Sequence, residues 1–179
     1  MGTVHQPMPV KLFCAILFKQ GVEAQPVVDE LTKQWGDVEC SLGPRHFTHS
    51  DYYVDEMGSG QRKMYLVLAW PLDPGELPAI KNRTNELEQK WSVGGLRTVN
   101  IDPGYLSRDK LMLATTKDFY HRLYLGSGIY GETTLHFRKG RFRYFSWTYP
   151  DYREPDVQAL LIKARASLVH ELRLKDDGD

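Results

Sequence analysis

The densest set of side chains that could do chemistry lies in residues 115–137, TTKDFYHRLYLGSGIYGETTLHF. Two apparent strands joined by Gly-Ser-Gly carry six such residues: Lys117, Asp118, His121, Arg122, Glu132 and His136. Arginine presents a planar fork of donors that suits phosphate or carboxylate, and glutamate or histidine can accept a proton. The stretch could therefore be the wall of an active site or the solvated face of a hairpin.

The residues on either side of Gly126-Ser127-Gly128 predict how the two strands pair. A three-residue turn makes the facing pairs Leu125–Ile129, Tyr124–Tyr130, Leu123–Gly131 and Arg122–Glu132. Because side chains alternate between faces, one face is expected to bury four apolar residues: Leu123, Leu125, Ile129 and Leu135. The other face is expected to carry Arg122, Tyr124, Tyr130, Glu132 and Thr134.

This polar face has two interpretations. In the functional one, Arg122 and Lys117 attract an anion, Tyr124 and Tyr130 supply stacking surface, and Glu132 accepts a proton or binds a metal. In the structural one, the face is solvated and Arg122 and Glu132 form a cross-strand pair worth about 0.2–1 kcal/mol.

Histidines between residues 46 and 51 offer two further possibilities. His46-Phe47-Thr48 matches the H-x-T element of two-histidine phosphoesterases, but no second H-x-T occurs, since His136-Phe137-Arg138 lacks the hydroxyl. His46, His49 and Asp51 could instead bind a metal, because imidazole and carboxylate suit zinc or manganese. The simpler alternative is a solvated loop.

Other catalytic patterns are weak. The chain has no G-x-S-x-G, and Cys14 lies within LFCAILF, where a thiol is expected to be buried. Its aromatic segment WTYPDYR, residues 147–153, could stack on a base or a peptide, or form a plug between the last strand and the last helix.

The elements that must position these residues follow from hydrophobic periodicity. Residues 10–18 and 64–70 read as buried strands, and 37–42 and 96–101 read as weaker ones, with a polar loop at 43–60. Helical spacing marks a helix after Ala24 that stops at Gly36, and a second after Asp73-Pro74-Gly75-Glu76 that ends at Gly94-Gly95. The order βαββαβ predicts an α+β protein whose first half is ferredoxin-like.

The second half reads as an antiparallel meander. Asp102-Pro103-Gly104 suits a type II turn, and four consecutive strands follow: LMLATTK, FYHRLYL, IYGETTLHF and RFRYFSW. A last helix is expected after Pro155. We expect one domain over residues 1–179, with residues 1–8 and 175–179 frayed.

Composition narrows the class of protein. Hydrophobic residues make up 41% of the 179, and 23 basic residues balance 23 acidic ones, which argues against a DNA-binding protein. No apolar run approaches the roughly 20 residues that cross a bilayer, and the first residues lack the features of a signal peptide. Two cysteines without a Cys-x-x-Cys pair fit a reducing cytoplasm.

Several segments together resemble a known family: VKLFCAILF, FTHSDYYVDEMG, LDPGELPAIKNRTNELE, VNID, GYLSRDKLMLATTKDFYHRLYLGSGIYGETTL and FSWTYPDYR. This family of bacterial and archaeal proteins of about the same length is catalogued as a domain of unknown function, and some members carry an automatic GTP-binding label. The resemblance covers nearly the whole chain and implies a single domain. It assigns no catalytic residues.

A GTPase of the familiar kind is not expected, because no G-x-x-x-x-G-K-[ST] loop is present. Thr116-Lys117-Asp118 lacks the residue that separates lysine from aspartate in the guanine-reading motif. Gly126-Ser127-Gly128 does not open a helix and therefore gains no helix dipole for phosphate.

Three hypotheses follow. The chain could bind a small anionic or nucleotide-like ligand between the meander and the 43–60 loop. It could be an enzyme acting on a phosphorylated substrate, with Glu132 or His121 as general base beside Asp102. It could also bind a protein partner through the exposed face of the meander. No cofactor is assigned, and the oligomeric state is left open.

Overall fold

The computed structural model describes residues 2–50 and 52–176. Its helices are α1 (Gln25–Trp35), α2 (Val54–Met57), α3 (Leu77–Lys90) and α4 (Pro155–Asp176), with 3₁₀ turns η1 (Pro74–Glu76) and η2 (Pro150–Arg153). The strands are β1 (Val10–Phe18), β2 (Val38–His46), β3 (Arg62–Leu72), β4 (Ser92–Val93), β5 (Leu96–Arg97), β6 (Val99–Leu106), β7 (Lys110–Thr115), β8 (Leu123–Gly126), β9 (Ile129–Arg138) and β10 (Arg141–Tyr144). This mixture confirms the α+β class.

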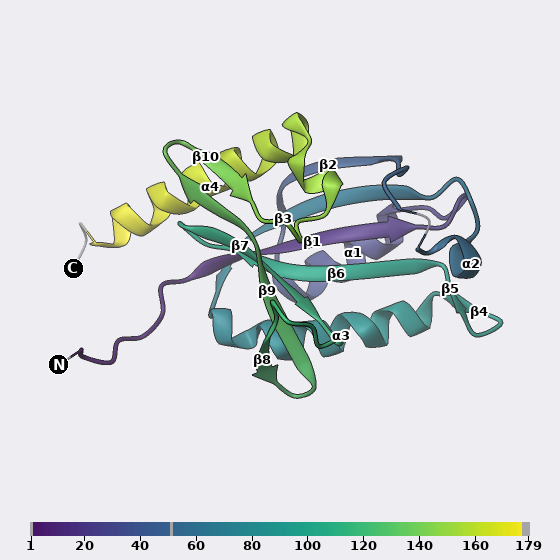
Figure 1. Cartoon of the computed structure of the whole chain (residues 1–179), viewed down its shortest axis with the longest axis horizontal. Helices are drawn as coiled ribbons and strands as arrows, with labels where there is room; N and C mark the ends of the chain where they lie inside the picture. The colour runs from purple at the N-terminus through teal and green to yellow at the C-terminus, as the bar shows by residue number, and fades with distance from the viewer. Residues whose placement is uncertain (1, 51, 177–179) are drawn as a thin grey trace.

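One eight-stranded sheet runs through both halves of the chain in the order β10-β9-β7-β6-β1-β3-β2, with β8 paired to β9 beside this path. Every neighbouring pair is antiparallel. Helices α1 and α3 pack on one face and α4 on the other, so the sheet is the middle layer (Figure 1).

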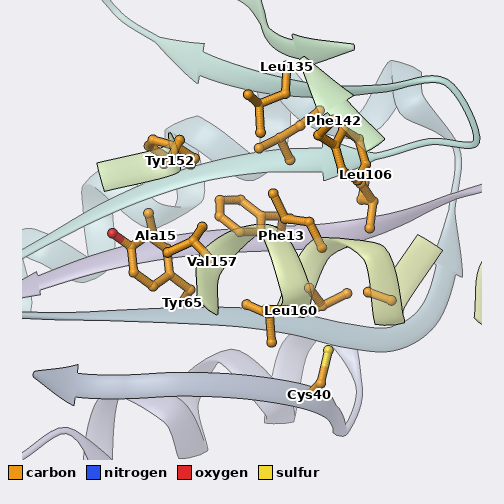
Figure 2. Close-up of a cluster of buried hydrophobic side chains, with 14 of the residues drawn as sticks. Phe13, Ala15, Cys40, Tyr65, Leu106, Leu135, Phe142, Tyr152, Val157 and Leu160 are labelled. Carbon is orange, nitrogen blue, oxygen red and sulfur yellow. The ribbon is translucent and has the colours of Figure 1, made fainter. Parts of the chain in front are cut away.

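Strand β1 lies at the centre of this arrangement and is buried over its whole length, as its apolar run predicts. Its two faces serve two cores, because alternate side chains point to opposite sides. Leu12, Cys14 and Ile16 face α1 and α3, whereas Phe13 faces α4. Figure 2 shows Phe13 among the apolar side chains of the α4 side.

The predicted helix signals at Gly36 and at Asp73–Glu76 are confirmed. Helix α1 ends at Trp35, and Gly36 follows with a φ of 91°. Asp73 and Glu76 form a reciprocal capping box around η1, which leads directly into α3. Helix α3 ends at Lys90, however, and Gly94-Gly95 form the turn between β4 and β5. The glycine pair therefore does not end the helix.

The type II turn predicted at Asp102-Pro103-Gly104 is wrong, because these residues continue β6. Strand β6 pairs with β1 from Val99 to Leu106, but with β7 only from Gly104 to Leu106. A β-carbon on Gly104 would lie 2.0 Å from the carbonyl oxygen of Met112 in β7. Glycine is therefore needed here for the close approach of two strands.

The meander is also corrected. Strand β7 pairs with β9 instead of β8, and β8 lies on the outer edge of β9, which it shares with β10. The pairs Leu123–Gly131 and Tyr124–Tyr130 are confirmed, but Ile129 faces Gly126 because Leu125 is an extra, bulged residue.

Two residues of the hairpin's apolar face that were predicted to be buried are exposed. Leu123 is 72% exposed and Leu125 is 37% exposed. Ile129 and Leu135 are buried but belong to different cores. A bulge at Thr134 sets two β9 residues against one β7 residue, which reverses the alternation between Ile129 and Leu135.

The segment predicted as a polar loop at 43–60 is partly structured. Strand β2 extends to His46, and α2 occupies Val54–Met57. Residues 2–9 have no helix or strand, and α4 continues to Asp176, while residues 177–179 lie outside the described chain. None of the described helices has the length and apolar character to cross a bilayer.

Candidate functional site

A cavity of about 510 Å³ opens where the sheet divides. Beyond Gly104 and Leu113, β6 stays with β1 while β7 follows β9, so the two strands diverge (Figure 1). Side chains of both strands line the opening, including Asn100 and Asp102 of β6 and Thr115 of β7. This volume suits a small-molecule ligand.

Helix α3 satisfies the edge of β6 that this divergence exposes. The amide of Ile101 donates to Glu88 Oε1 at 2.8 Å, and its carbonyl accepts from Lys81 Nζ at 2.8 Å. By alternation, Pro103 presents its missing N–H to the same side, so no strand hydrogen bond is lost there. Two buried side chains of one helix thus replace the absent strand.

The same side chains begin a polar network along the α3 and β6 wall. Arg97 contacts Glu56 at 2.7 Å and Glu88 at 3.0 Å, and its Nη1 donates to Asn100 Oδ1 at 2.7 Å. Asn100 then donates to Asp102 Oδ2 at 2.9 Å. Burial raises the pKa of Glu88, whereas the hydrogen bonds from Arg97 lower the pKa of Glu56.

The opposite wall is built on Glu132 of β9. Its Oε2 accepts from Arg122 Nε at 2.8 Å and lies 3.0 Å from His121 Nε2. Arg122 Nη1 also donates to the carbonyl of Lys117 at 3.0 Å. His121 stacks on Trp147 with ring centroids 4.8 Å apart, and this contact holds the imidazole ring in its orientation toward Glu132. The predicted Arg122–Glu132 contact across the hairpin is confirmed.

A third wall comes from η2 and β3. Asp151 accepts from Lys63 Nζ at 2.5 Å and from the Tyr65 hydroxyl at 2.6 Å. The Lys63 ammonium lies 4.8 Å from the ring centroid of Phe47 and 5.3 Å from that of Tyr152. Lys63 is therefore held between aromatic faces and one buried carboxylate.

Residues 47–50 and 52–53, in the connection between β2 and α2, close the remaining side. The Tyr52 hydroxyl accepts a hydrogen bond from Lys117, and His49 Nε2 lies 2.5 Å from Glu154 Oε1. The Tyr53 ring lies 5.6 Å from the guanidinium of Arg97. Contacts to three different parts of the chain thus hold this segment beside the cavity.

Three tyrosines that line the cavity are neutral at physiological pH. Burial raises the pKa of Tyr53, Tyr149 and Tyr152, and the nearby charge of Asp102 raises each of them further. Their hydroxyls can therefore donate hydrogen bonds, while the charge in the cavity comes from lysine, arginine and carboxylate groups.

The structure brings together five of the residues singled out in the sequence: Lys117, Arg122, Glu132, Asp102 and His49. His121 stands behind Glu132 and is not part of the lining. Tyr124 and Tyr130 contact each other with ring centroids 5.3 Å apart, away from the residues that line the cavity. His46 ends β2 outside the cavity, and Asp51 lies outside the described residues.

Sequence reasoning missed the residues that α3 and β3 contribute, above all Lys81 and Lys63. Lys81 lies on the apolar face of α3 between Ile80 and Thr84, and a lysine at a buried helix position was the available signal. The aromatic segment 147–153 was identified from the sequence, and its residues serve both of the roles considered there, contact with a ligand site and packing in the core. Tyr152 plugs the core and touches the cavity, whereas Tyr149 lines the cavity while half exposed.

Residue types that bind metals are not clustered in the part of the chain that the structure describes. Among residues 2–50 and 52–176, no group of three or more His, Cys, Asp or Glu side chains is arranged around a common point. His49 already contacts Glu154, and His46 lies apart from the cavity. The donors that line the cavity, mainly ammonium, guanidinium and hydroxyl groups, suit anions better than cations.

Comparison with known proteins gives one match. The family model described as Domain of unknown function (DUF4416) matches residues 8–168. No curated protein and no solved structure matches the chain. The resemblance to a family of unknown function is thereby confirmed over most of the sequence. This chain belongs to the DUF4416 family.

Proposed function

We propose that this protein binds a small anionic ligand in the cavity between β6 and β7. The supporting observation is the lining, which carries five cationic side chains against three carboxylates: Lys63, Lys81, Arg97, Lys117 and Arg122 against Asp102, Glu132 and Asp151. Cations gathered in a concave, partly desolvated site favour an anion more than the same charges on an open surface.

Arg122 and Lys117 are the groups through which the anion is held. Arg97 is committed to Glu56, Glu88 and Asn100, and Lys63 is committed to Asp151. Arg122 uses Nε for Glu132 and Nη1 for a carbonyl, which takes up two of the five N–H donors of its guanidinium. Lys117 is exposed and reaches Tyr52, whose ring adds stacking surface beside the charge.

Calorimetry against nucleotides and phosphorylated metabolites tests this function. Arg122→Ala should weaken binding more than tenfold, or about 1.4 kcal/mol, because a charge-assisted hydrogen bond is lost. Lys117→Ala should weaken binding in the same direction. The matched controls are Arg138→Ala on β9 and Lys110→Ala on β7, both exposed and outside the cavity.

Folding of each variant is checked by circular dichroism. Equal affinity of the parent and Arg122→Ala would remove Arg122 from the site. If the parent binds no member of the panel, the anion-binding function is wrong. The exposed apolar residues of the hairpin region, Phe119, Tyr120, Leu123 and Tyr124, would then favour a protein partner.

A second candidate function is catalysis on a phosphorylated substrate. It is favoured by Glu132, whose two hydrogen bonds from Arg122 and His121 both end on Oε2, so that Oε1 can serve as a general base. His121 would then orient Glu132, and Asp102 would face the substrate from β6. Turnover of any ligand found by calorimetry, and its loss in Glu132→Gln, would establish catalysis.

We also infer that the chain forms one domain with a ferredoxin-like first half. In support, β6-β1-β3-β2 is the order of the strands from the βαββαβ segment, and the two helices of that segment, α1 and α3, pack on the same face. The later strands extend this sheet at β6, where the cavity lies. The proposed site therefore lies at the junction between the two halves.

A further inference from the structure

The two walls of the cavity differ in charge. The α3 and β6 wall holds one connected group of two cations and three carboxylates: Lys81, Arg97, Glu56, Glu88 and Asp102. With all three carboxylates counted as ionised, two positive and three negative charges leave this group with one net negative charge. The facing wall has Arg122 and Lys117 against Glu132, which leaves one net positive charge.

The negative charge of the first wall is presented at Asp102. Its side chain is 38% exposed, whereas Glu132 and Asp151 are 3% and 2% exposed. Lys81 Nζ lies 3.6 Å from Asp102 Oδ1, beyond hydrogen-bond distance, because this ammonium donates to the carbonyl of Ile101. Asp102 is thus the carboxylate that a ligand meets.

The remaining lining does not offset this charge. Lys63 and Asp151 neutralise each other, and the tyrosine hydroxyls stay protonated. An anion that filled the whole cavity would bring negative charge against Asp102 in a site of reduced dielectric, which is unfavourable. A group that donates hydrogen bonds and carries positive charge would complement it.

We propose that the ligand is a small zwitterion, with an acidic group against Arg122 and Lys117 and a protonated amine against Asp102. This assignment rests on the proposed anion-binding function and names the class of ligand within it. The phosphorylated or carboxylated end meets the positive wall, and the ammonium spans to β6. Amino acids and amine-bearing phosphate esters have this chemistry.

Matched ligand pairs that differ in the amine test the assignment. Calorimetry at pH 7 compares O-phosphoethanolamine with ethyl phosphate, and glutamate with glutarate. The parent protein should prefer the amine-bearing member of a pair by more than tenfold, because a charged acceptor left without its donor weakens binding strongly. This comparison needs no variant, so it does not depend on the folding of a substituted protein.

Asp102→Asn then assigns the preference to its residue. This near-isosteric change should reduce the preference to less than about threefold while binding of the amine-free anions is kept or improved. Asp109→Asn, in the exposed turn between β6 and β7, is the matched control and should behave as the parent does.

The outcomes separate the two proposals. If the parent binds both members of each pair equally, the zwitterion is wrong and the anion site stands. A preference that survives in Asp102→Asn also overturns the assignment. If neither pair binds while a nucleotide or phosphorylated metabolite does, the zwitterion assignment is wrong and the anion-binding function stands. If nothing in either panel binds, both proposals are wrong.

Discussion

Glu132→Ala is the substitution that tests most directly how the cavity wall is held together. Glu132 is 3% exposed, and its partners Arg122 and His121 are 13% and 8% exposed. Removing one partner of a buried ion pair costs about 3–5 kcal/mol, because the other charge is left without compensation. Arg122 keeps its hydrogen bond to the carbonyl of Lys117, so we expect the lower end, about 3 kcal/mol.

The free energy of unfolding, measured by urea denaturation followed by circular dichroism, should fall by that amount. For a chain of this size about 3 kcal/mol corresponds to a loss of roughly 6–12 °C in Tm. The matched control is Glu86→Ala, which removes an exposed partner of Arg83 at 2.7 Å and should change stability by less than about 0.5 kcal/mol.

A double-mutant cycle identifies the cause. If most of the loss comes from the stranded guanidinium, Glu132→Ala combined with Arg122→Ala should lose at least about 1 kcal/mol less than the sum of the single variants. Additive losses would show that the pair is not coupled. A loss below about 1 kcal/mol in Glu132→Ala alone would refute a buried, hydrogen-bonded Glu132.

Three further predictions concern the elements around the site. Gly104→Ala should destabilise the protein by about 1–3 kcal/mol in urea denaturation, because its new β-carbon meets the Met112 carbonyl. The control Gly2→Ala, which has nothing within 4 Å of the new β-carbon, should leave stability unchanged. Equal stability of the two variants would contradict the close approach of β6 and β7. Burial raises the pKa of Glu88 above its usual 4.5, so the folded protein binds this proton more tightly than the unfolded chain, and the resulting stability is present below pH 4.5 and lost as pH rises through the folded pKa. In urea titrations between pH 4 and 8, the free energy of unfolding should therefore decline less with rising pH in Glu88→Gln than in the parent. Identical pH profiles of the two proteins would rule this out. Burial also raises the pKa of the Cys14 thiol to about 12, so a thiol-reactive dye at pH 8 should label Cys14 only after unfolding in denaturant. Mass spectrometry distinguishes Cys14 from the second free thiol, Cys40, and rapid labelling of Cys14 in the native protein would show that β1 is accessible.

Much of the central framework could be predicted from local patterns. The nearly unbroken apolar run from Val10 to Phe18, which only Lys11 interrupts, predicts a strand covered on both faces. The Asp73 to Glu76 capping box predicts a helix start, because its hydrogen bonds join residues three apart in sequence. Such signals are local, so they need no knowledge of what packs against them.

Pairing across the Gly-Ser-Gly turn was predictable for only part of the hairpin. Tyr124 faces Tyr130 as alternation requires, but bulges at Leu125 and Thr134 change which residues face the core. A bulge inserts one residue and reverses the alternation beyond it. Counting from the turn therefore places Tyr124–Tyr130 and Leu123–Gly131 correctly, but it fails for Leu125–Ile129 at the first bulge and for Leu135 beyond the second.

Arg122 and Glu132 were found from sequence because they are ten residues apart on one hairpin, and their contact is set by that hairpin. Their cavity was not predictable in the same way. It exists because β6 leaves β7 after Gly104, and because Lys81 and Glu88 of α3 replace the missing strand at Ile101. Those contacts join residues of α3 to Ile101 of β6, 13 and 20 residues later in the chain, and they form only when α3 packs against the face of the sheet.

The sequence by itself determined the α+β class, the buried central strands, the capped helices and one charged pair, because each depends on residues close together in the chain. Tertiary structure alone decided that Asp102-Pro103-Gly104 continues a strand, since its conformation follows from β1 on one side and a divided sheet on the other. It also decided that Asp102 and Arg122 line one cavity. That meeting depends on strand order, which no local pattern encodes.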